Sequence, residues 1–447
     1  MIRALRTTMR LSRADLWLGG MAVGLGVLTA AGPELHWRLG GWTLIALFAV
    51  GSIAAFYAVR LGEQADQNNA LLIILLGAVA MRLALLFTEP TLSSDIYRYI
   101  WDGRVQASGV NPYRYVPAAS ELASLRDPAI WRHINRADYA VTIYPPVAQS
   151  IFLAVTRFGE SVAIMKLGLL LFEAVGVATI IALLGRLGLP ATHVVAYAWH
   201  PLPVWEIAGN GHVDAAMLAF LLVGLLAFLH GRTLTAGVLV TLGALIKPVA
   251  LLALPVLWRP WNWRLPLVVM MTILFAYLPY LSVGTGVLGF LPGYLHEEGF
   301  TSGAGYKLLW LVQLATGPLR HGATVYITAS ALGLIALSLA IGFRSDRSAQ
   351  ASLRAVSWLL IAFLVLFSPN YPWYFLALVP LLALTPSTTA WALTTAGVLF
   401  YDVVPADILP PYEVRIAVFT LAMLAALAHD LWGEWRKPMP IAVGETS

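Results

Sequence analysis

The stretch that decides the fold is ALLIILLGAVAMRLALLFT (residues 70–88), and SSDIYRYIWDGR (residues 93–104) follows it closely. The first segment is apolar and has the length of about 20 residues that a helix needs to cross a bilayer. The second segment gathers charged and aromatic side chains just beyond that span. At helical spacing Asp95, Arg98 and Asp102 share one face. The sequence therefore predicts a transmembrane helix that leads into a polar helical segment at the membrane boundary.

The composition excludes a soluble globular protein. Of the 447 residues, 59% are hydrophobic and only 11% are charged, whereas soluble domains contain about 25% charged residues. The absence of cysteine excludes disulfides, thiol catalysis and cysteine metal sites. The net charge of +5 is typical of basic residues that flank and orient membrane spans. We therefore expect membrane lipids, and not nucleic acid, as partners.

Apolar stretches of spanning length predict an all-α, polytopic bundle of about 12 to 14 transmembrane helices. The clearest candidates lie near residues 16–33, 41–60, 70–88, 162–184, 191–207 and 213–230, and further candidates near 265–282, 322–343, 354–369, 372–385, 389–404 and 412–431. Residues 145–157 are expected to enter the interface and return. Residues 234–257 are expected to form a hairpin of two short helices, because Pro248 interrupts the pattern after Lys247.

We expect one integral-membrane domain with three parts. Residues 1–69 form an N-terminal segment and a helical hairpin, residues 70–258 a central module with a loop at 89–140, and residues 259–447 the C-terminal helices. Arg3, Arg6, Arg10 and Arg13 place the N-terminus in the cytoplasm, and the first apolar stretch is expected to remain uncleaved. Three spans then bring the 89–140 loop, with short interfacial helices, to the extracytoplasmic side. Counting the later predicted spans in the same way places the C-terminus in the cytoplasm, as in a bacterial inner-membrane protein.

Ionisable residues inside predicted spans mark candidate site positions. Such a residue costs about 2.5–3.5 kcal/mol at the centre of a span, so it usually faces a cavity or a partner. We expect Arg82 to extend its side chain to the outer interface. Lys166 and Glu173 share a helical face and form either an ion pair or part of a site. Lys247 lies at the predicted break, where free amides and helix dipoles would favour a phosphate; pairing to a carboxylate is the alternative.

Two polar turns are expected near the level of the 89–140 loop. One contains His200, Glu206, His212 and Asp214, side chains that could bind a metal. Their spacing matches no compact ligand motif, so we expect a solvated, hydrogen-bonded turn. The other turn, residues 368–374, carries aromatic rings that fit an interfacial belt or a site. The glycine-rich residues 283–306 are expected to form a flexible loop, with a lid as the alternative.

These residues suit sugar transfer from a lipid phosphate. That reaction requires a carboxylate to take a hydroxyl proton, cations for the departing phosphate and an apolar groove for the lipid chain. Asp95 is the candidate general base, and Asp102 is expected to orient the acceptor or to share Arg98. An Arg98 that pairs with both carboxylates would keep their pKa values low. A purely structural Asp–Arg network is the alternative.

The other candidate site residues fall into two groups. Those for the donor phosphate are Lys247, Arg98, Arg104 and Lys166, and those for the acceptor or the sugar are Tyr99, Tyr144, Asn210, His212, Asp214, Trp373 and Tyr374. We expect no cofactor and no divalent metal, because Arg98 and Arg104 supply positive charge within the loop. No Asp-x-Asp pair occurs there.

The segment DIYRYIWDGR (95–104), followed by GVNPY (109–113) and IYPP (143–146), resembles the first outer loop of GT-C type glycosyltransferases. The closest likeness is to bacterial polyprenyl-phosphate-mannose-dependent mannosyltransferases, and a more distant one is to the mannosyltransferase of glycolipid anchors. The resemblance continues, in the same order, with the Lys166 to Glu173 face, NGHVD (210–214), IKP (246–248) and PWY (372–374), and it covers about residues 80–385. Two spans precede the loop-bearing helix, which departs from a minimal module of this family.

The resemblance implies an inverting membrane enzyme whose site lies on the extracytoplasmic face, with Asp95 as the base. Its donor would be a polyprenyl-phosphate sugar, with mannose as the sugar, and its acceptor a lipid-linked or other glycan. Two other functions remain open. A polymerase or ligase of lipid-linked glycans would keep the same donor class, and a glycolipid transporter or flippase would use the intramembrane charges as a substrate path.

Overall fold

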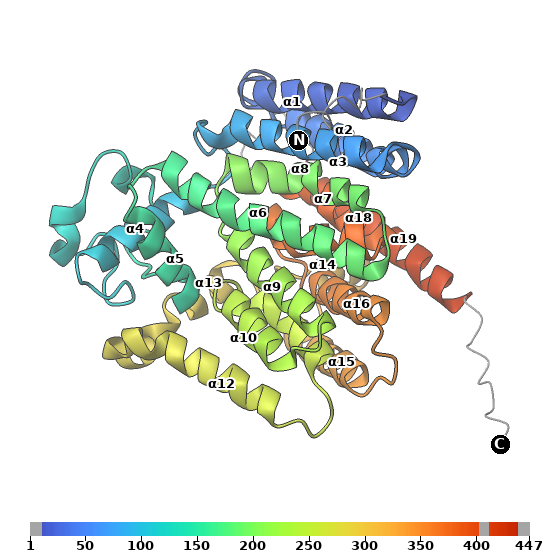
Figure 1. Ribbon diagram of the computed structural model, residues 1–447. Coiled ribbons are helices and arrows are strands. Elements are labelled where there is room, and N and C mark those ends of the chain that lie inside the picture. The colour runs from blue at the N-terminus through green and yellow to red at the C-terminus, as the bar shows by residue number, and fades with distance from the viewer. Residues whose placement is uncertain (1–10, 402–410, 437–447) are drawn as a thin grey trace.

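The computed structural model describes residues 11–401 and 411–436. Over these residues the chain is helical and contains no strand, which confirms the all-α prediction. The predicted roles of Arg3, Arg6 and Arg10, the last residues of the 389–404 span and the end of the C-terminal segment lie outside the described residues. Figure 1 shows helices α1 to α3 on one side of the molecule, α12 on the opposite side, and α4 with α5 at one end.

Among the described residues, eight helical segments are long and apolar enough to cross a membrane. They are α1 (Arg13–Leu39), α2 (Gly41–Gln64), α3 (Gln67–Leu86), α6 (Val162–Leu187), α12 (Arg264–Tyr277) with its continuation through η6 (Leu278–Leu288) and α13 (Leu291–Glu297), α15 (Gly322–Gly342), α16 (Ala349–Phe367) and α19 (Tyr412–Trp435). These segments identify an integral membrane protein. The larger number of spans stays a prediction.

Shorter helices complete the bundle. They are α5 (Pro146–Thr156), α9 (Asp214–Leu229), α10 (Thr233–Ala244), η5 (Pro248–Ala253) with α11 (Leu254–Leu257), α14 (Lys307–Thr316), η7 (Pro372–Leu378) with α17 (Val379–Leu384), and α18 (Thr388–Ala396) with η8 (Gly397–Phe400). The break predicted within residues 234–257 is confirmed, because α10 ends at Ala244 and η5 begins at Pro248.

Residues 191–207, predicted as one span, do not form a continuous helix. The segment divides into η3 (Ala191–Val194), α7 (Val195–Ala198), α8 (Pro201–Pro203) and the π-helix η4 (Val204–Gly209). Proline lacks an amide hydrogen and clashes with the preceding turn, so Pro201 starts a new element instead of extending α7. The apolar composition of residues 191–207 correctly predicted that the segment is buried, but it wrongly predicted one continuous helix.

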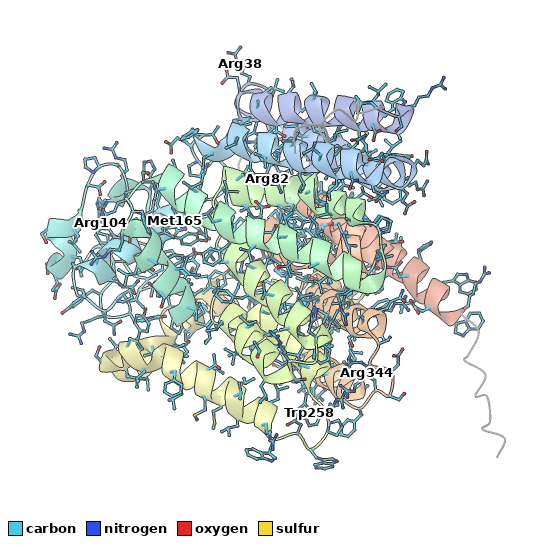
Figure 2. All side chains as sticks on the ribbon, viewed as in Figure 1. Arg38, Arg82, Arg104, Met165, Trp258 and Arg344 are labelled. Carbon is cyan, nitrogen blue, oxygen red and sulfur yellow. The ribbon has the colours of Figure 1, made fainter. Side chains whose placement is uncertain are left out.

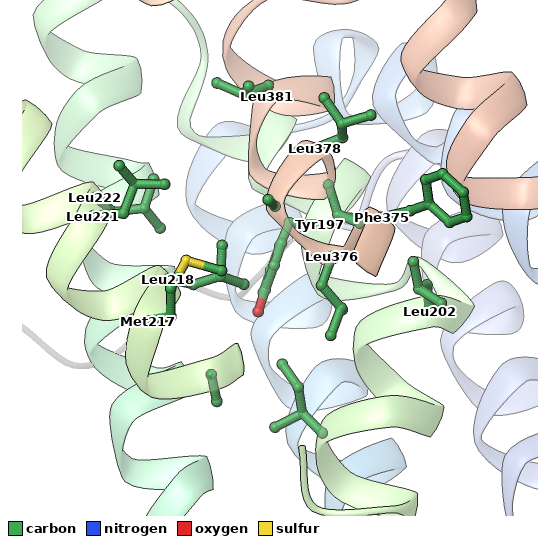
Figure 3. Packing of buried hydrophobic residues seen from close by; sticks show 14 of the residues in the cluster. Tyr197, Leu202, Met217, Leu218, Leu221, Leu222, Phe375, Leu376, Leu378 and Leu381 are labelled. Carbon is green, nitrogen blue, oxygen red and sulfur yellow. The ribbon is translucent and has the colours of Figure 1, made fainter. Parts of the chain in front are cut away.

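The core lies around this broken segment. Tyr197 is buried between Met217, Leu218 and Leu221 of α9 on one side and Leu376 of η7 on the other (Figure 3). Helix α9 also packs between α6 and α10. The segments that carry the polar turns are therefore held in the interior of the bundle.

Arg82 does not extend to the interface as expected. Its guanidinium is buried and donates to Glu173 Oε1 at 2.8 Å and Oε2 at 3.3 Å, and also to the carbonyl of Ala198. Figure 2 shows Arg82 within the stack of helices. Because lipid cannot solvate a charge, each member of this buried pair supplies the counter-charge that the other needs. Arg82 and Glu173 therefore join α3, α6 and the end of α7.

Lys166 does not pair with Glu173, although the two share a face of α6. Its amine donates to the carbonyls of Leu85 at 3.1 Å and Thr88 at 2.6 Å. Leu85 lies in the last turn of α3, and Thr88 directly follows the C-cap residue of this helix. Lys166 thus fixes the end of α3, directly before the 89–140 loop.

Candidate active site

Helix α4 (Asp95–Ala107) forms the wall of the candidate site, and short 3₁₀ turns η1 (Ser120–Leu125) and η2 (Trp131–His133) follow it. The predicted helical register is confirmed: Arg98 Nε donates to Asp102 Oδ1 at 2.8 Å, four residues further on. Asp95 is the first residue of α4, where a negative charge interacts favourably with the helix dipole. Its amide donates to Ser93 Oγ at 3.2 Å.

A cavity of about 1800 Å³ opens beside α4. Many of the residues predicted for the site line it: Asp95, Arg98, Tyr99, Tyr144, His212, Lys247, Trp373 and Tyr374. Its apolar walls include Phe87 just after α3, Ile327 of α15, and Phe363 and Phe367 of α16. Since α3, α15 and α16 are candidate spans, the cavity joins a polar centre to apolar surfaces of membrane-spanning helices.

Asp95 is half-buried on the wall of this cavity. Its Oδ1 accepts a hydrogen bond of 3.1 Å from Asn135 Nδ2. Desolvation and the negative charge of Asp95, together with hydrogen bonds to Tyr99 and Asp95, raise the pKa of Tyr144. Desolvation and the charges of Asp95 and Asp214 also raise the pKa of Tyr99. The two phenols therefore stay neutral beside Asp95 and can donate hydrogen bonds.

Asp102 lies away from the cavity, in a buried network. It is 2% exposed, and its second oxygen accepts from Gln149 Nε2 at 2.9 Å. Its partner Arg98 also donates to the carbonyl of Ala140 at 3.2 Å. The structure thus pairs Arg98 with Asp102 and with a backbone carbonyl, and it does not bring the Asp102 carboxylate to the cavity.

Lys247 and Asp214 form an ion pair at the cavity. Lys247 Nζ lies 2.6 Å from Asp214 Oδ2 and 4.7 Å from the centre of the Tyr374 ring. The Lys247 side chain is 17% exposed, while that of Asp214 is 2% exposed. The predicted alternative of a carboxylate partner is therefore confirmed, and the lysine still faces the cavity. Asp214 forms the ion pair with Lys247 from the buried side of the lysine and does not line the cavity itself.

The remaining predicted residues lie outside the cavity wall. Arg104 donates to Asp127 and to Glu160, at 2.7 Å for the latter, at the far end of α4 (Figure 2). Asn210 Oδ1 accepts from the amides of Thr91 at 3.2 Å and Leu92 at 2.9 Å. Asn210 therefore holds the segment that leads into α4, and Lys166 holds the residues before it through the carbonyls of Leu85 and Thr88.

The polar turn around residues 200–214 is not solvated as expected. His200, Glu206, His212 and Asp214 are each at most 2% exposed. His212 stacks on Trp373 with ring centres 4.4 Å apart, and Trp373 stacks on Tyr371 at 4.5 Å. In the part of the chain that the structure describes, no three histidine, cysteine or acidic side chains are grouped to hold a metal ion. His212 of this turn therefore lines the cavity beside Trp373 of the 368–374 turn.

Several cavity residues were not predicted. Asn135 contacts Asp95, and the His133 ring stacks on Tyr97 with centres 4.5 Å apart. Arg136 lines the cavity, and its backbone has a positive φ of 54°. All lie in the 89–140 loop, but in a part without helical periodicity. The position of these residues inside the polar loop was the only signal that could have found them.

The glycine-rich residues 283–306 cover one side of the cavity. Phe290, Leu291 and Tyr294 line it, and the Tyr294 hydroxyl lies 2.5 Å from that of Tyr374. Arg136 joins this segment to the 89–140 loop through Glu297 at 2.7 Å. Desolvation lowers the pKa of Arg136, but hydrogen bonding and the charge of Glu297 outweigh it and raise that pKa. The segment is thus attached over the cavity.

The fold and the cavity define an integral membrane protein of helical type, with acidic, basic and aromatic side chains around one space. The model of the alpha-(1->6)-mannopyranosyltransferase family, N-terminal domain, matches residues 14–273, more than half of the chain, so the chain belongs to this family. The resemblance to bacterial mannosyltransferases seen in the sequence is thereby confirmed.

Two relatives carry the name alpha-(1->6)-mannopyranosyltransferase A. The protein of Mycobacterium tuberculosis is 24% identical over 331 residues, which are 65% of this chain and 61% of the relative. The protein of Corynebacterium glutamicum is 26% identical over 187 residues, which are 40% of this chain and 37% of the relative. The chain thus covers less than two thirds of either relative's length. No solved structure matches the chain.

Proposed function

We propose that this protein transfers mannose from a polyprenyl-phosphate donor to a lipid-linked or other glycan acceptor on the extracytoplasmic face of the membrane. Asp95 acts as the general base, and the reaction inverts the anomeric centre. The relatives are named as alpha-(1->6)-mannopyranosyltransferases. An inverting enzyme that makes such an α-linkage requires a β-linked donor.

One observation carries the proposal: a half-buried carboxylate and a supported lysine face the same cavity. Asp95 and Lys247 both line it. Tyr99 lies within electrostatic range of both Asp95 and Asp214, the partner of Lys247. A glycosyl transfer requires a base at the attacking hydroxyl and a positive charge at the departing phosphate. Asp95 and Lys247 place such a base and such a cation on one cavity.

The chemistry follows from this placement. An acceptor hydroxyl beside Asp95 gives its proton to the carboxylate while its oxygen forms a bond to C1 of the mannosyl unit. The bond from C1 to the phosphate oxygen breaks, and that oxygen keeps the electron pair. Asn135 holds the Asp95 carboxylate at 3.1 Å. The departing group is polyprenyl phosphate, which carries the added negative charge.

Lys247 is the proposed contact for that phosphate, with Arg98 as a second positive charge on the cavity. The segment after Lys247, η5, packs against α16, and α16 supplies Phe363 and Phe367 to the cavity wall. A lipid chain attached to a phosphate at Lys247 would therefore meet apolar side chains. We propose that these cations of the chain suffice without a cofactor or a divalent metal.

The test uses the purified protein with radiolabelled polyprenyl-phosphate mannose and a membrane lipid extract. Wild-type protein is expected to form a labelled, α-linked product. Because a general base contributes about 100- to 10,000-fold, Asp95→Asn is expected to reduce turnover by that factor without loss of folded protein. Asp138→Asn is the matched control, since Asp138 is exposed on the same loop and lies outside the cavity.

Three results would overturn the proposal. Near-normal turnover of Asp95→Asn would remove this carboxylate as the base. Movement of labelled lipid across liposomes without a new glycosidic bond would assign the cavity to a flippase instead. Transfer of preassembled glycan chains and not of single mannosyl units would favour the polymerase.

A further inference from the structure

Glu206 has no part in the chemistry above, yet its carboxylate is fully buried directly behind the cavity wall. It lies in the π-helix η4 (Val204–Gly209) and is 0% exposed. Its Oε1 accepts from the Tyr401 hydroxyl, and its Oε2 accepts from Asn210 Nδ2 at 3.3 Å. Isolated π turns occur frequently at functional sites. Burial of a carboxylate is costly unless its partners use the charge.

The third partner of this carboxylate is His212. His212 Nε2 lies 3.1 Å from Glu206 Oε2, within ion-pair distance but without the alignment of a hydrogen bond. The His212 amide also donates to the Glu206 carbonyl at 2.9 Å. On its face the imidazole stacks on Trp373. The ring is therefore held at one edge by Glu206 and on one face by Trp373.

This arrangement selects one form of the imidazole. A carboxylate beside Nε2 favours a proton on that nitrogen, which leaves the lone pair of Nδ1 free in the neutral ring. Nε2 is fully buried, whereas the His212 side chain also lines the cavity. Nδ1 is thus the nitrogen left to accept a hydrogen bond there, and a sugar offers hydroxyl groups as donors.

We propose that Glu206 is a positioning residue: it fixes the orientation and the Nε2–H tautomer of His212, so that Nδ1 accepts a hydrogen bond from a hydroxyl of the bound mannosyl unit. The identity of that ligand rests on the proposed function. His212 is two residues from Asp214, which supports Lys247, so the contact falls beside the proposed phosphate position. Glu206 acts through His212 and does not touch the substrate.

The tautomer can be tested without any activity. Solid-state NMR of the full-length protein labelled with ¹⁵N-histidine distinguishes Nε2–H from Nδ1–H rings. The chain has nine histidines, and the His212 signal is assigned by its loss in His212→Asn. The wild-type protein is expected to show Nε2–H alone, and Glu206→Gln a mixture of tautomers. Tyr401→Phe keeps the carboxylate and is expected to keep Nε2–H.

An Nδ1–H ring in the wild-type protein would overturn the proposal, even if Glu206→Gln failed to fold. An unchanged tautomer in a folded Glu206→Gln protein would overturn it as well. Neither result depends on the donor or on mannosyl transfer. The NMR measurement can therefore reject the role of Glu206 without rejecting the proposed function.

Mannosyl transfer supplies the second test, a double-mutant cycle. Glu206→Gln and His212→Asn are each expected to reduce turnover about 10- to 100-fold, as for loss of one hydrogen bond that a charged group supports. Because one residue acts through the other, the double variant should be no slower than His212→Asn alone. Glu173→Gln is the matched control, since Glu173 is also buried but pairs with Arg82.

The control variant is expected to add its full effect to that of His212→Asn. If the effects of Glu206→Gln and His212→Asn simply multiplied, Glu206 would serve the fold independently of His212, and the proposal would be wrong. A wild-type protein that transfers no mannose would contradict the proposed function, while the NMR result would still decide the role of Glu206.

Discussion

Asp95 and Asp102 lie two turns apart on the same helix, yet they have opposite environments. Asp95 is half-buried on the cavity wall, where Asn135 donates to it at 3.1 Å. Asp102 is 2% exposed and shares its two oxygens between Arg98 and Gln149. The shared helical face did not decide which carboxylate is available to a substrate. The segments packed against each end of α4 decide it.

Two ion pairs of the helical bundle show the same contrast. Arg82 and Glu173 are both buried among spans, and a third contact goes to a backbone carbonyl. Lys247 is partly exposed to the cavity, while only its partner Asp214 is buried. We call an ion pair closed when both side chains are buried and open when its cation reaches the cavity. A closed pair joins helices, whereas an open pair can also bind an anion. The following predictions test this distinction between closed and open charges.

The largest effect on stability is expected for Asp102→Ala. Arg98 would remain buried without its ionic partner, and removal of one member of a buried pair costs about 3–5 kcal/mol. The midpoint of thermal unfolding of the purified protein in detergent measures this loss. Asp95→Ala should lower the free energy of unfolding by only about 1 kcal/mol, because Asp95 is half-buried and its hydrogen-bond partners Asn135 and Tyr144 are neutral. Equal losses for the two variants would contradict the contrast between these residues.

The second prediction concerns the packing that buries Asp102. A Cβ at Gly103 would lie 2.6 Å from the carbonyl oxygen of Phe152 and from Thr156 Oγ1, so Gly103→Ala must push α5 away from α4. Overpacking of this kind costs about 1–3 kcal/mol. Gly185→Ala is the control, because it places a methyl group on α6 with nothing within 4 Å. A Gly103→Ala protein as stable as this control would show that α4 and α5 are less closely packed.

The sequence predicted the register of α4 but not the environment of its residues. Spacing alone places Asp95, Arg98 and Asp102 on one face, and the Arg98–Asp102 bond confirms it. Gln149 and Asn135, which distinguish the two carboxylates, come from distant segments. Helical periodicity describes a single element, so it carries no information about contacts between elements.

The same limit explains the errors among the intramembrane charges. Lys166 and Glu173 share a face of α6, but the partner of Glu173 comes from α3. The apolar content of residues 191–207 predicted a span, whereas the prolines broke it into short pieces. The hairpin break after Lys247 was predicted correctly because proline acts through its own backbone. Effects of a residue on its own backbone could therefore be predicted from the sequence. Contacts between side chains of different helices could be identified only in the structure.

The third prediction separates the open ion pair from the closed one. Lys247→Ala is expected to raise the KM for the polyprenyl-phosphate donor about tenfold, as for loss of one charged hydrogen bond to the phosphate. KM does not depend on the folded fraction, so destabilisation through Asp214 does not imitate this result. Arg82→Met combined with Glu173→Leu removes the closed pair without a stranded charge and should leave donor KM unchanged. An unchanged KM in Lys247→Ala would contradict the phosphate role.

The smallest effect is expected at the other end of α4, where Arg104 contacts Asp127. Partial burial raises the pKa of Asp127, but hydrogen bonds from the Ile130 amide and Arg104, with the charge of Arg104, outweigh it and hold that pKa below the usual 3.8. A carboxyl whose pKa is lowered by folding stabilises the fold when ionised. This contribution is complete above the unfolded pKa and is lost as the pH falls through the folded pKa.

Asp127→Asn should therefore lower the unfolding midpoint slightly at about pH 7, because the variant lacks the charge that Arg104 and the amides favour. The difference from the wild-type protein should shrink as the pH falls below 3.8, where Asp127 becomes protonated and resembles asparagine. Thermal unfolding of both proteins at several pH values measures it. A difference that is independent of pH would mean that Asp127 acts through its hydrogen-bonded shape alone. In that case the Arg104 end of α4 would be fixed by geometry and not by charge.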